Sequence, residues 1–533
     1  MGAHRAHQVP RRGAPAARGA VRGGVARQHR HGPAEGHALR ARHDARGRRA
    51  GGGVRGPRRA RRHHRGEPGG LRMTAPVAAA LEDLARAFPA ERLARDPERL
   101  EAYGRDESDL GSYPPDVAVL VESAEEVREV FRIASAHRVP VVPVAARSGK
   151  SGGVLALHGG IAVSLERLNR ILEISPEDLV ARVEPGVITG QLQAAVEQHG
   201  LFYPPDPNSL EMCTIGGNVA ENAGGPRALK YGVTREYVLG LTAVVPTGEI
   251  VKAGHRSIKG VAGYDLTGLF VGSEGTLGIV TEVTLKLLPR PRHVSTALVV
   301  FDSVATAARA VSRVLAQGVI PRCLELLDDV SLAAAAKTSP FRFPAGAGAA
   351  LLVETDGNDE EGVFAEIVRV AEIVQGDASG EVIVAQNEAQ RRDVWETRRY
   401  LSVNLKALHP KKLSEDIAVP RSRIPEMVER AKGIGARRGL VVATYGHAGD
   451  GNLHCNVLFD REDQRPQVDL AVAEILRAAV DLGGTITGEH GVGLAKRDFL
   501  EYEQGRELVA LQRRLKAVFD PLGILNPGKI FPG

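Results

Sequence analysis

Hydrophobic positions recur at two different spacings along the chain, and these spacings predict both helices and strands. Residues 123–134 carry apolar side chains three and four positions apart behind a Ser-x-x-Glu capping box, which predicts a helix with one buried face (Val127, Val130, Phe131, Ala134). Residues 276–288 alternate between apolar and polar, which predicts a half-buried strand. By the same criteria we expect helices within 73–105 and at 189–199, 304–316 and 359–374, strands at 139–144, 161–165, 179–183 and 349–355, and a hairpin at 239–251.

The order of these elements indicates the fold class. Helices and strands are mixed without regular β–α–β alternation, so we predict an α+β fold rather than a doubly wound sheet. A length of 533 residues suggests two or three domains. A second unit should begin near residues 289–292, and the Pro- and Gly-rich residues 521–533 should be extended.

The first 72 residues differ from the rest of the chain. They hold 19 Arg, no Lys and three acidic residues, a net charge of +16, whereas the remaining 51 basic and 61 acidic residues sum to −10. They lack Ile, Phe, Tyr, Trp, Ser and Thr, so they cannot bury a core and should be disordered. We interpret residues 1–72 as an over-extended gene start, with Met73 as the initiator. A basic arm for nucleic acid is the alternative, and we expect no nucleic-acid partner.

Composition also bears on location. Cys213, Cys323 and Cys455 are scattered, so they cannot form a disulfide framework or hold an iron–sulfur cluster by themselves. No apolar run is long enough to cross a bilayer. We therefore expect a cytoplasmic protein that is not integral to a membrane, with peripheral association at the inner membrane face and a homodimer both left open.

Three glycine-rich stretches suggest a bound cofactor. Residues 143–153 (Pro-Val-Ala-Ala-Arg-Ser-Gly-Lys-Ser-Gly-Gly) follow a predicted strand, and their backbone N–H groups could form a nest for a pyrophosphate. The run is neither a Walker loop nor a Rossmann fingerprint, and alone it also fits an ordinary flexible loop. Residues 204–225 and 263–280 add further glycine turns, which allow a flat cofactor to approach the backbone closely.

Together these stretches resemble the FAD-binding domain of the vanillyl-alcohol oxidase (PCMH-type) superfamily. The similarity extends from about residue 73 to 533 and is greatest to the group of glycolate oxidase D-subunits, D-lactate dehydrogenases and D-2-hydroxyglutarate dehydrogenases. It implies a two-part FAD-binding domain at 73–290, an α+β substrate and metal-binding cap domain at 291–520, and a segment at 521–533 that returns to the flavin. The FAD-binding residues that it implies are Ala145, Ser148, Gly149, Ser151, Gly152, Gly153, Pro205, Thr214, Gly217, Asn218, Glu221, Asn222, Gly224, Gly225, Gly278, Ile279, Val280 and Asn526.

Two details qualify the resemblance. The family loop usually has Gly where this chain has Arg147. The loop and the glycine stretches contain no histidine at which some superfamily members attach flavin covalently, so non-covalent FAD is expected.

Two further motifs predict a metal site. His447 and His454 flank a Gly-Asp-Gly turn between strand-like residues, and a hairpin would put them opposite each other with converging ring nitrogens. Glycines on both sides of Glu489-His490 bring a carboxylate and an imidazole into a tight turn. A lone histidine in a turn is usually a surface residue, but His447, His454 and Glu489 together suit a catalytic divalent ion such as zinc, manganese or iron, with zinc preferred. Related dehydrogenases hold their metal on the matching residues.

The resemblance implies the oxidation of a D-2-hydroxy acid such as glycolate or D-lactate. The metal would bind the hydroxyl and one carboxylate oxygen, His490 would take the hydroxyl proton, and the C2 hydride would pass to flavin N5. Arg398 resembles the family's arginine for the substrate carboxylate, with a helix-surface arginine as the alternative. Asn456 is predicted on the same face as His454 and completes the catalytic candidates. Lys411 and Lys412 are weaker candidates that we expect to be solvated.

Two other enzyme classes stay open. A flavin-free metallohydrolase could use His447, His454 and Glu489, but it leaves the glycine stretches unexplained. A non-redox flavin enzyme of the alkylglycerone-phosphate synthase type would use the same fold. For a dehydrogenase, the expected electron acceptor is a quinone, a cytochrome, an electron-transfer flavoprotein or a separate iron–sulfur subunit.

Overall fold

The computed structural model describes residues 75–379 and 382–532. By its internal contacts the chain divides into units 1–70 and 71–533, and every element below belongs to the second unit. The predicted tail, 1–72, and Met73 lie outside the described residues.

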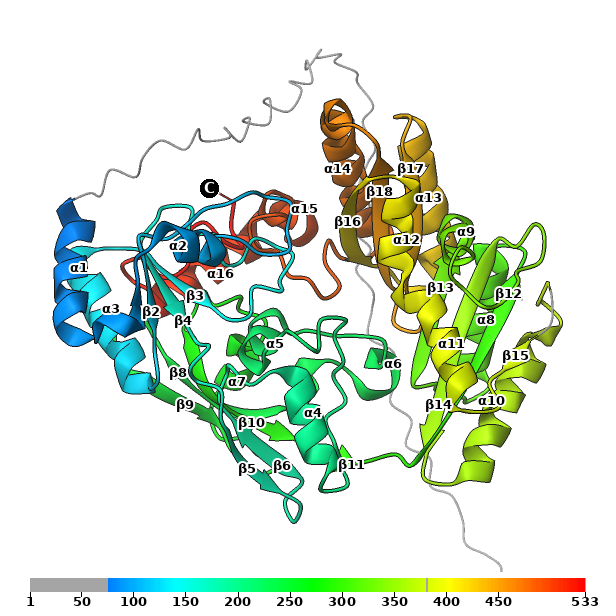
Figure 1. Ribbon diagram of the computed structural model, residues 1–533, viewed down its shortest axis with the longest axis horizontal. Coiled ribbons are helices and arrows are strands. Elements are labelled where there is room, and N and C mark those ends of the chain that lie inside the picture. Colours follow the sequence, from blue (N-terminus) through cyan, green and yellow to red (C-terminus); the bar gives the residue numbers. More distant parts are fainter. Residues whose placement is uncertain (1–74, 380–381, 533) are drawn as a thin grey trace, which may run out of the picture. The chain divides into compact units, whose positions relative to one another are not determined.

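Helices and strands are mixed along the chain, as expected for the α+β class (Figure 1). The α-helices are α1 Ala75–Ala87, α2 Pro97–Tyr103, α3 Ala124–His137, α4 Thr189–Glu197, α5 Ile215–Glu221, α6 Ala228–Tyr231, α7 Leu266–Phe270, α8 Val304–Ala316, α9 Asp329–Ala335, α10 Glu360–Gln375, α11 Glu388–Arg399, α12 Leu401–Leu408, α13 Ile424–Ala436, α14 Arg465–Asp481, α15 Leu500–Gln504 and α16 Arg506–Phe519. Short 3₁₀ turns occur at Ala90–Arg92, Thr234–Glu236, Arg421–Arg423, Glu462–Gln464 and Arg497–Phe499.

The N-terminal part contains two main sheets. The first has the order β1-β2-β4-β3 and is parallel except at β1. The second, β5-β6-β10-β8-β9, is antiparallel, and β7 and β11 form a separate pair. The strands are β1 Leu93–Ala94, β2 Val117–Leu120, β3 Val141–Val144, β4 Ile161–Ser164, β5 Ile171–Ser175, β6 Val180–Val183, β7 Leu201–Phe202, β8 Val238–Val244, β9 Ile250–Gly254, β10 Ile279–Lys286 and β11 Leu288–Pro289.

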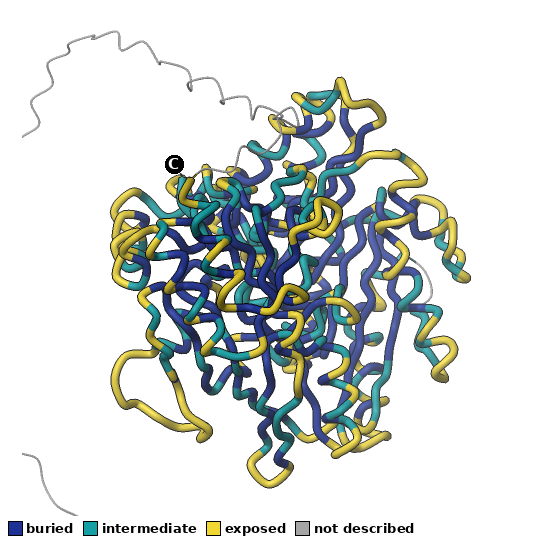
Figure 2. The backbone as a smooth tube through the Cα atoms, turned by 60° about the vertical axis from the view of Figure 1, so that its left-hand side comes forward, coloured by how far each residue is buried: buried dark blue, intermediate teal, exposed yellow. Residues whose placement is uncertain are grey.

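The C-terminal part is built on one antiparallel sheet of seven strands, in the order β15-β12-β14-β13-β17-β18-β16. One apolar core joins this sheet to α8, α10, α13 and α14, and a second core joins it to α9, α11 and α12, so helices cover both faces. Residues of its central strands, such as β14 and β18, are accordingly almost all buried, and Figure 2 shows how buried segments run through the interior of the molecule. The strands are β12 His293–Phe301, β13 Cys323–Asp328, β14 Ala349–Gly357, β15 Ile383–Val384, β16 Lys411–Ala418, β17 Val441–His447 and β18 Asn452–Phe459.

The end of the chain returns to the first sheet. Leu525 forms a parallel bridge with Val141 of β3, and the backbone N–H of Asn526 donates to the Val141 carbonyl at 2.7 Å. Ile524 and Leu525 are buried in the core of that sheet. The segment thereby brings Asn526 beside the glycine-rich loop that follows β3.

Most predicted elements are confirmed within a few residues. The helix at 304–316 has the predicted bounds, and the apolar face of α3 is fully buried. The Ser123 hydroxyl accepts from the Glu126 N–H, but the Glu126 carboxylate accepts from Glu122 rather than from Ser123. None of the described helices is long and apolar enough to span a membrane.

The predicted pairing of the two hairpin histidines was wrong by two residues. His447 lies opposite Asn452, and His454 lies opposite Tyr445. The reason is the length of the turn: four residues, 448–451, connect the strands, so the register pairs the residues that directly flank them. Because side chains two positions apart on a strand share a face, the histidines are still diagonal neighbours, with ring centroids 5.6 Å apart.

Candidate active site

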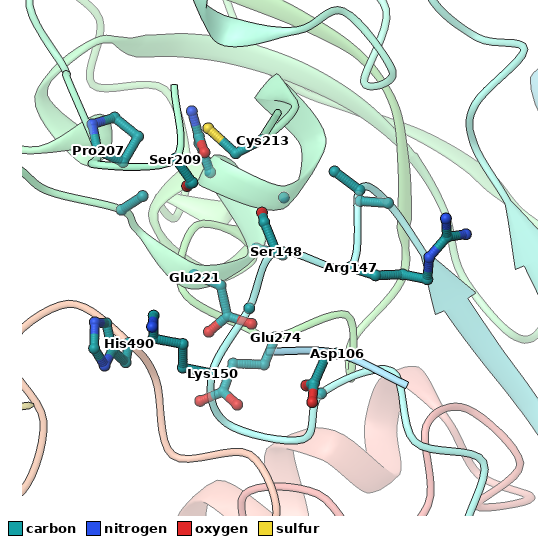
Figure 3. Close-up of a pocket in the computed structure, with 18 of the residues that line it drawn as sticks. Asp106, Arg147, Ser148, Lys150, Pro207, Ser209, Cys213, Glu221, Glu274 and His490 are labelled. Carbon is teal, nitrogen blue, oxygen red and sulfur yellow. The ribbon is translucent and has the colours of Figure 1, made fainter. Parts of the chain in front are cut away.

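A cavity of about 430 Å³ runs from the glycine-rich loop to His454 of the hairpin. Its wall combines the loop after β3, the start of α5, the turn before β10 and the C-terminal Asn526 (Figure 3). Of the predicted cofactor residues, the wall includes Ala145, Ser148, Gly149, Gly153, Thr214, Gly217, Asn218, Glu221, Gly224, Gly278, Ile279, Val280 and Asn526.

The other five predicted cofactor residues do not line the cavity and instead contact neighbouring residues of the protein. The Asn222 side chain accepts from the Arg235 N–H, and the Pro205 carbonyl accepts from Gln193. A Cβ at Gly225 would overlap the Asp206 carbonyl, so this glycine allows a close backbone contact. The Ser151 carbonyl accepts two backbone N–H groups from residues 494 and 495, and Gly152 packs against Leu110.

The wall has the polar groups that a cofactor needs. Thr214 Oγ1, Glu221 Oε2 and Asn526 Oδ1 are buried and have no hydrogen-bond partner among the described residues. Buried polar atoms are rarely left unpaired, so these three indicate a polar ligand in the cavity. Arg147 adopts φ 61°, a conformation that favours glycine, and its guanidinium lies over the Tyr103 ring. Arg147 therefore occupies a backbone position at which glycine is favoured.

Carboxyl groups gather beside the glycine loop. Glu221 and Glu274 lie close together on the wall, with Asp106 nearby (Figure 3). Burial raises the pKa of Glu274 to about 7, against the effect of the N–H groups of Val492 and Gly493 that its carboxylate accepts. Burial, with the charges of Glu274 and Asp106, raises the pKa of Glu221 well above its usual value.

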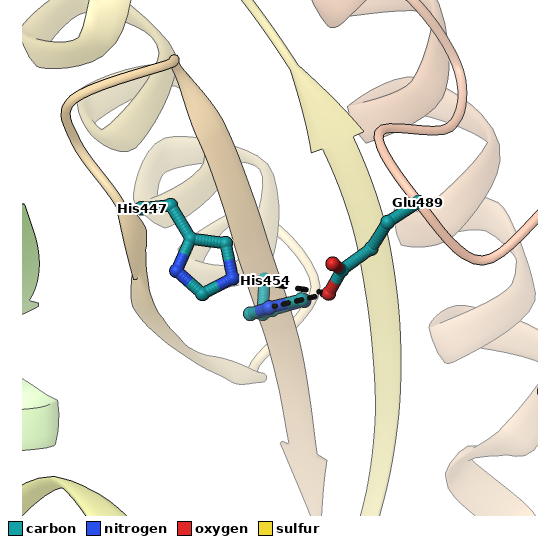
Figure 4. Close-up of side chains that lie close together, drawn as sticks. All are labelled: His447, His454 and Glu489. Atoms are coloured by element: carbon teal, nitrogen blue, oxygen red, sulfur yellow. Dashed lines mark ion pairs between the residues drawn. The ribbon is translucent and has the colours of Figure 1, made fainter. Parts of the chain in front are cut away.

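At the other end of the cavity three potential metal ligands converge. One ligand atom from each of His447, His454 and Glu489 lies within 4.8 Å of the others (Figure 4). Glu489 Oε1 is 3.8 Å from His447 Nε2 and 3.6 Å from His454 Nε2. Burial lowers the pKa of His454 to about 3, so its ring is neutral and offers a lone pair. Two imidazoles and a carboxylate are a donor set that fits a divalent transition metal.

His490 follows Glu489 and lies on the cavity wall. Its ring stacks on that of His454, with centroids 5.5 Å apart and an interplanar angle of 21°. Burial lowers its pKa below the usual value, so the imidazole is neutral at physiological pH and able to accept a proton.

Two buried carboxylates that sequence reasoning missed hold this arrangement. Asp416 Oδ2 accepts the Thr487 hydroxyl and the N–H groups of Gly488, Glu489 and His490, at 2.9–3.0 Å. Glu325, opposite His447 in the sheet, accepts from His447 Nδ1. The only sequence signal for Glu325 was a carboxylate among the apolar residues of β13, and Asp416, in the mixed sequence of β16, had no signal of its own.

The residues predicted near the substrate carboxylate do not all have the surroundings that the sequence led us to expect. Lys412 was expected to be solvated, which is wrong: it lies on the cavity wall, and its Nζ donates to Ser402 Oγ at 2.8 Å. Burial and the neighbouring Lys150 and Lys406 lower its pKa to about 8. Arg398 is buried rather than on a helix surface, bonded to Glu325 and stacked on Tyr445. Asn456 lies behind the wall, where its side chain contacts Lys412 Nζ at 3.4 Å.

Comparison with known proteins identifies the family. Residues 115–254 match the model of an FAD binding domain, and residues 290–530 match that of FAD linked oxidases, C-terminal domain. The chain is 44% identical to the glycolate oxidase subunit GlcD of Bacillus subtilis over 419 residues, which are 78% of this chain and 89% of that protein. The chain belongs to the FAD-linked oxidases.

Other relatives of this FAD-linked oxidase agree. D-lactate dehydrogenase of Anaerostipes hadrus is 37% identical over 81% of this chain and 92% of that protein, and D-2-hydroxyglutarate dehydrogenase of Stutzerimonas stutzeri is 33% identical over 85% and 99%. The fold matches p-cresol methylhydroxylase with a TM-score of 0.71 at 17% identity, covering 86% of this chain and 97% of that one. The predicted PCMH-type FAD-binding fold is confirmed, and the protein is an FAD-linked oxidoreductase. Membership in this family excludes the alternative of a flavin-free metallohydrolase.

Proposed function

We propose that this FAD-linked oxidase oxidises a small D-2-hydroxy acid, such as glycolate or D-lactate, to the 2-oxo acid. The observation that supports this most directly is the convergence of His447, His454 and Glu489 beside His490, at one end of the cavity that would hold FAD. Three relatives, named glycolate oxidase, D-lactate dehydrogenase and D-2-hydroxyglutarate dehydrogenase, each act by name on a 2-hydroxy acid.

The cavity residues would hold two groups that supply the chemistry. FAD bound there would supply a hydride acceptor for the alcohol carbon, and a divalent ion held by His447, His454 and Glu489 would lower the pKa of the substrate hydroxyl. The orphaned polar atoms of Thr214, Asn526 and Glu221 support a flavin bound along the glycine loop, and we propose that it is held non-covalently.

His490 is proposed as the general base. Its buried, neutral imidazole lines the cavity next to the ligand set, and its Nε2 is 4.0 Å from Glu489 Oε1. A hydroxyl group bound beside Glu489 would therefore lie within reach of this nitrogen, which would take and hold the proton.

The substrate carboxylate is assigned to Lys412. Its ammonium is on the same part of the wall as Ser402, Tyr445 and His490, and a charge-assisted bond to a carboxylate would orient the acid. Arg398, stacked on the ring of Tyr445, is proposed to assist. Asn456 contacts Lys412 and is proposed as a positioning residue.

We further propose that residues 73–290 and 291–520 form the FAD-binding and cap domains, and that electrons leave to a quinone, cytochrome, electron-transfer flavoprotein or iron–sulfur subunit. The seven-stranded sheet, with helices on both faces, lies wholly within the proposed cap domain.

The test is anaerobic addition of single acids to the flavin-loaded protein. D-lactate, glycolate or D-2-hydroxyglutarate should bleach the flavin absorbance, whereas L-lactate should not. A flavin that none of these acids reduces would contradict the proposal and favour a non-redox enzyme of the alkylglycerone-phosphate synthase type.

A further inference from the structure

Glu325 is a fully buried carboxylate on β13 that contacts two separate functional candidates. Oε1 accepts from Nδ1 of His447, and Oε2 is 2.8 Å from Nε of Arg398. One buried carboxylate therefore connects a proposed metal ligand with a proposed substrate cation.

We infer that Glu325 is a positioning residue shared by the metal site and the substrate-binding arginine, so that occupation of one depends on the geometry of the other. This inference rests on the proposed function. It concerns how the site is assembled rather than which group performs the reaction.

On the metal side, backbone pairing fixes the contact. Glu325 and His447 lie opposite each other on β13 and β17, so the carboxylate approaches the ring at Nδ1. When His447 donates its Nδ1–H to Glu325, the lone pair is left on Nε2, which is 3.8 Å from Glu489 Oε1. Mutation of a carboxylate that holds a histidine ligand in this way typically lowers metal affinity or activity by 10–100-fold.

On the substrate side, Glu325 bonds Nε of Arg398, not the terminal NH₂ groups that grip a carboxylate in a bidentate pair. The guanidinium carbon lies 4.5 Å from the centroid of the Tyr445 ring, and Tyr445 lines the cavity. The Nε bond and the ring contact together fix the plane of the guanidinium beside the cavity. Loss of Glu325 would leave a buried arginine free to rotate.

A purely structural ion pair is the competing explanation, and Glu354 is a matched control for it. Glu354 is also buried, lies on the adjacent strand β14, and pairs with an arginine, Arg322, at 3.3 Å. It has no contact with the ligand set or with Arg398 in the described residues. Glu354→Gln should therefore reproduce any general loss of stability without affecting the site.

The experiment compares Glu325→Gln and Glu354→Gln in flavin-loaded protein. Manganese affinity is measured from the free Mn²⁺ signal in electron paramagnetic resonance, and KM is measured with the best D-2-hydroxy acid. We expect Glu325→Gln to weaken Mn²⁺ binding by about 10–100-fold and to raise KM by about tenfold or more, and Glu354→Gln to change both less than about twofold.

Glu325→Asp separates position from charge, and it provides a second variant if the amide does not fold. It keeps the negative charge but is one methylene shorter, so it cannot reach both partners. Normal Mn²⁺ affinity and KM in Glu325→Asp, or equal losses in Glu354→Gln, would overturn the inference. Wild-type protein without saturable Mn²⁺ binding would instead contradict the proposed metal site, and KM would still test the contact with Arg398.

Discussion

The rings of His454 and His490 stack 5.5 Å apart, although 36 positions separate them in the chain. His454 belongs to β18, and His490 lies within a turn whose backbone N–H groups donate to the Asp416 carboxylate. A proposed metal ligand and a proposed base thus lie side by side.

Metal removal should stop turnover and leave the flavin bound. The ligand set belongs to β17, β18 and the 487–491 turn, and none of its three residues is a proposed flavin-binding residue. We expect dialysis against a chelator to lower kcat by about two orders of magnitude, with recovery on adding Zn²⁺ or Mn²⁺. Flavin absorbance and metal content are measured on the same sample. Full activity in metal-free protein would contradict the proposed metal site.

His490→Asn should slow flavin reduction and leave flavin binding unchanged. Loss of a positioned general base costs roughly 10²–10⁴-fold in rate. The measurement is anaerobic stopped-flow absorbance at saturating substrate. The control is His409→Asn, since His409 pairs with Asp460 away from the cavity. A rate within fivefold of the wild type would assign the proton to another group.

Lys412→Met should weaken substrate binding because it removes the cation from the cavity wall. A hydrogen bond to a charged group contributes about 1.5–3 kcal/mol, so KM should rise by roughly 10–100-fold. In the wild type, KM should increase as pH rises through about 8, where the ammonium loses its proton. Lys411→Met is the matched control, because Lys411 is exposed and pairs with Glu462. Equal KM values for the two variants would count against the assignment.

Gly491→Ala should displace the turn that bears Glu489 and His490. Gly491 has φ +87°, and a Cβ there would overlap the Glu221 carboxylate. We expect both Mn²⁺ affinity and the rate of flavin reduction to fall by about tenfold or more. Gly439→Ala has a similar backbone strain (φ +65°) with open space around its Cβ. Should both variants lose only stability, the steric account of the turn would be wrong.

Glu221→Gln should stabilise the flavin-loaded protein at alkaline pH. Because the pKa of Glu221 is raised on folding, ionisation costs stability as pH rises from the unfolded value through the folded one. The neutral amide avoids this cost, so the melting temperature of the variant should match the wild type near pH 4.5 and exceed it by one to a few degrees at pH 8. The exposed Glu211→Gln is the control. A constant difference across this range would show that the carboxyl does not titrate as described.

Local patterns predicted the elements well. The bounds of α8 and the buried face of α3 follow from apolar spacing, because a helix that packs on a sheet must bury one stripe. The glycine-rich loop was predicted as a cofactor cradle even though Arg147 breaks the family pattern. Its left-handed conformation explains why glycine is usual at that position.

Long-range pairing could not be predicted. The register of β17 and β18 depends on the four-residue turn between them, so the diagonal placement of the histidines became clear only in the sheet. Glu325 was not recognised as a candidate, and Lys412 was a weaker candidate expected to be solvated. Their roles depend on which strands become neighbours, which is decided by the packing of the whole seven-stranded sheet.

The amino-acid sequence by itself determined the chemical inventory: the glycine turns, the histidine pair, the Glu-His turn and the family to which they belong. Tertiary structure alone decided which carboxylates orient those groups and which cation faces the cavity. The reason is physical: apolar spacing is a local property of a helix or strand, whereas a buried ion pair forms only when distant strands bring opposite charges together out of water.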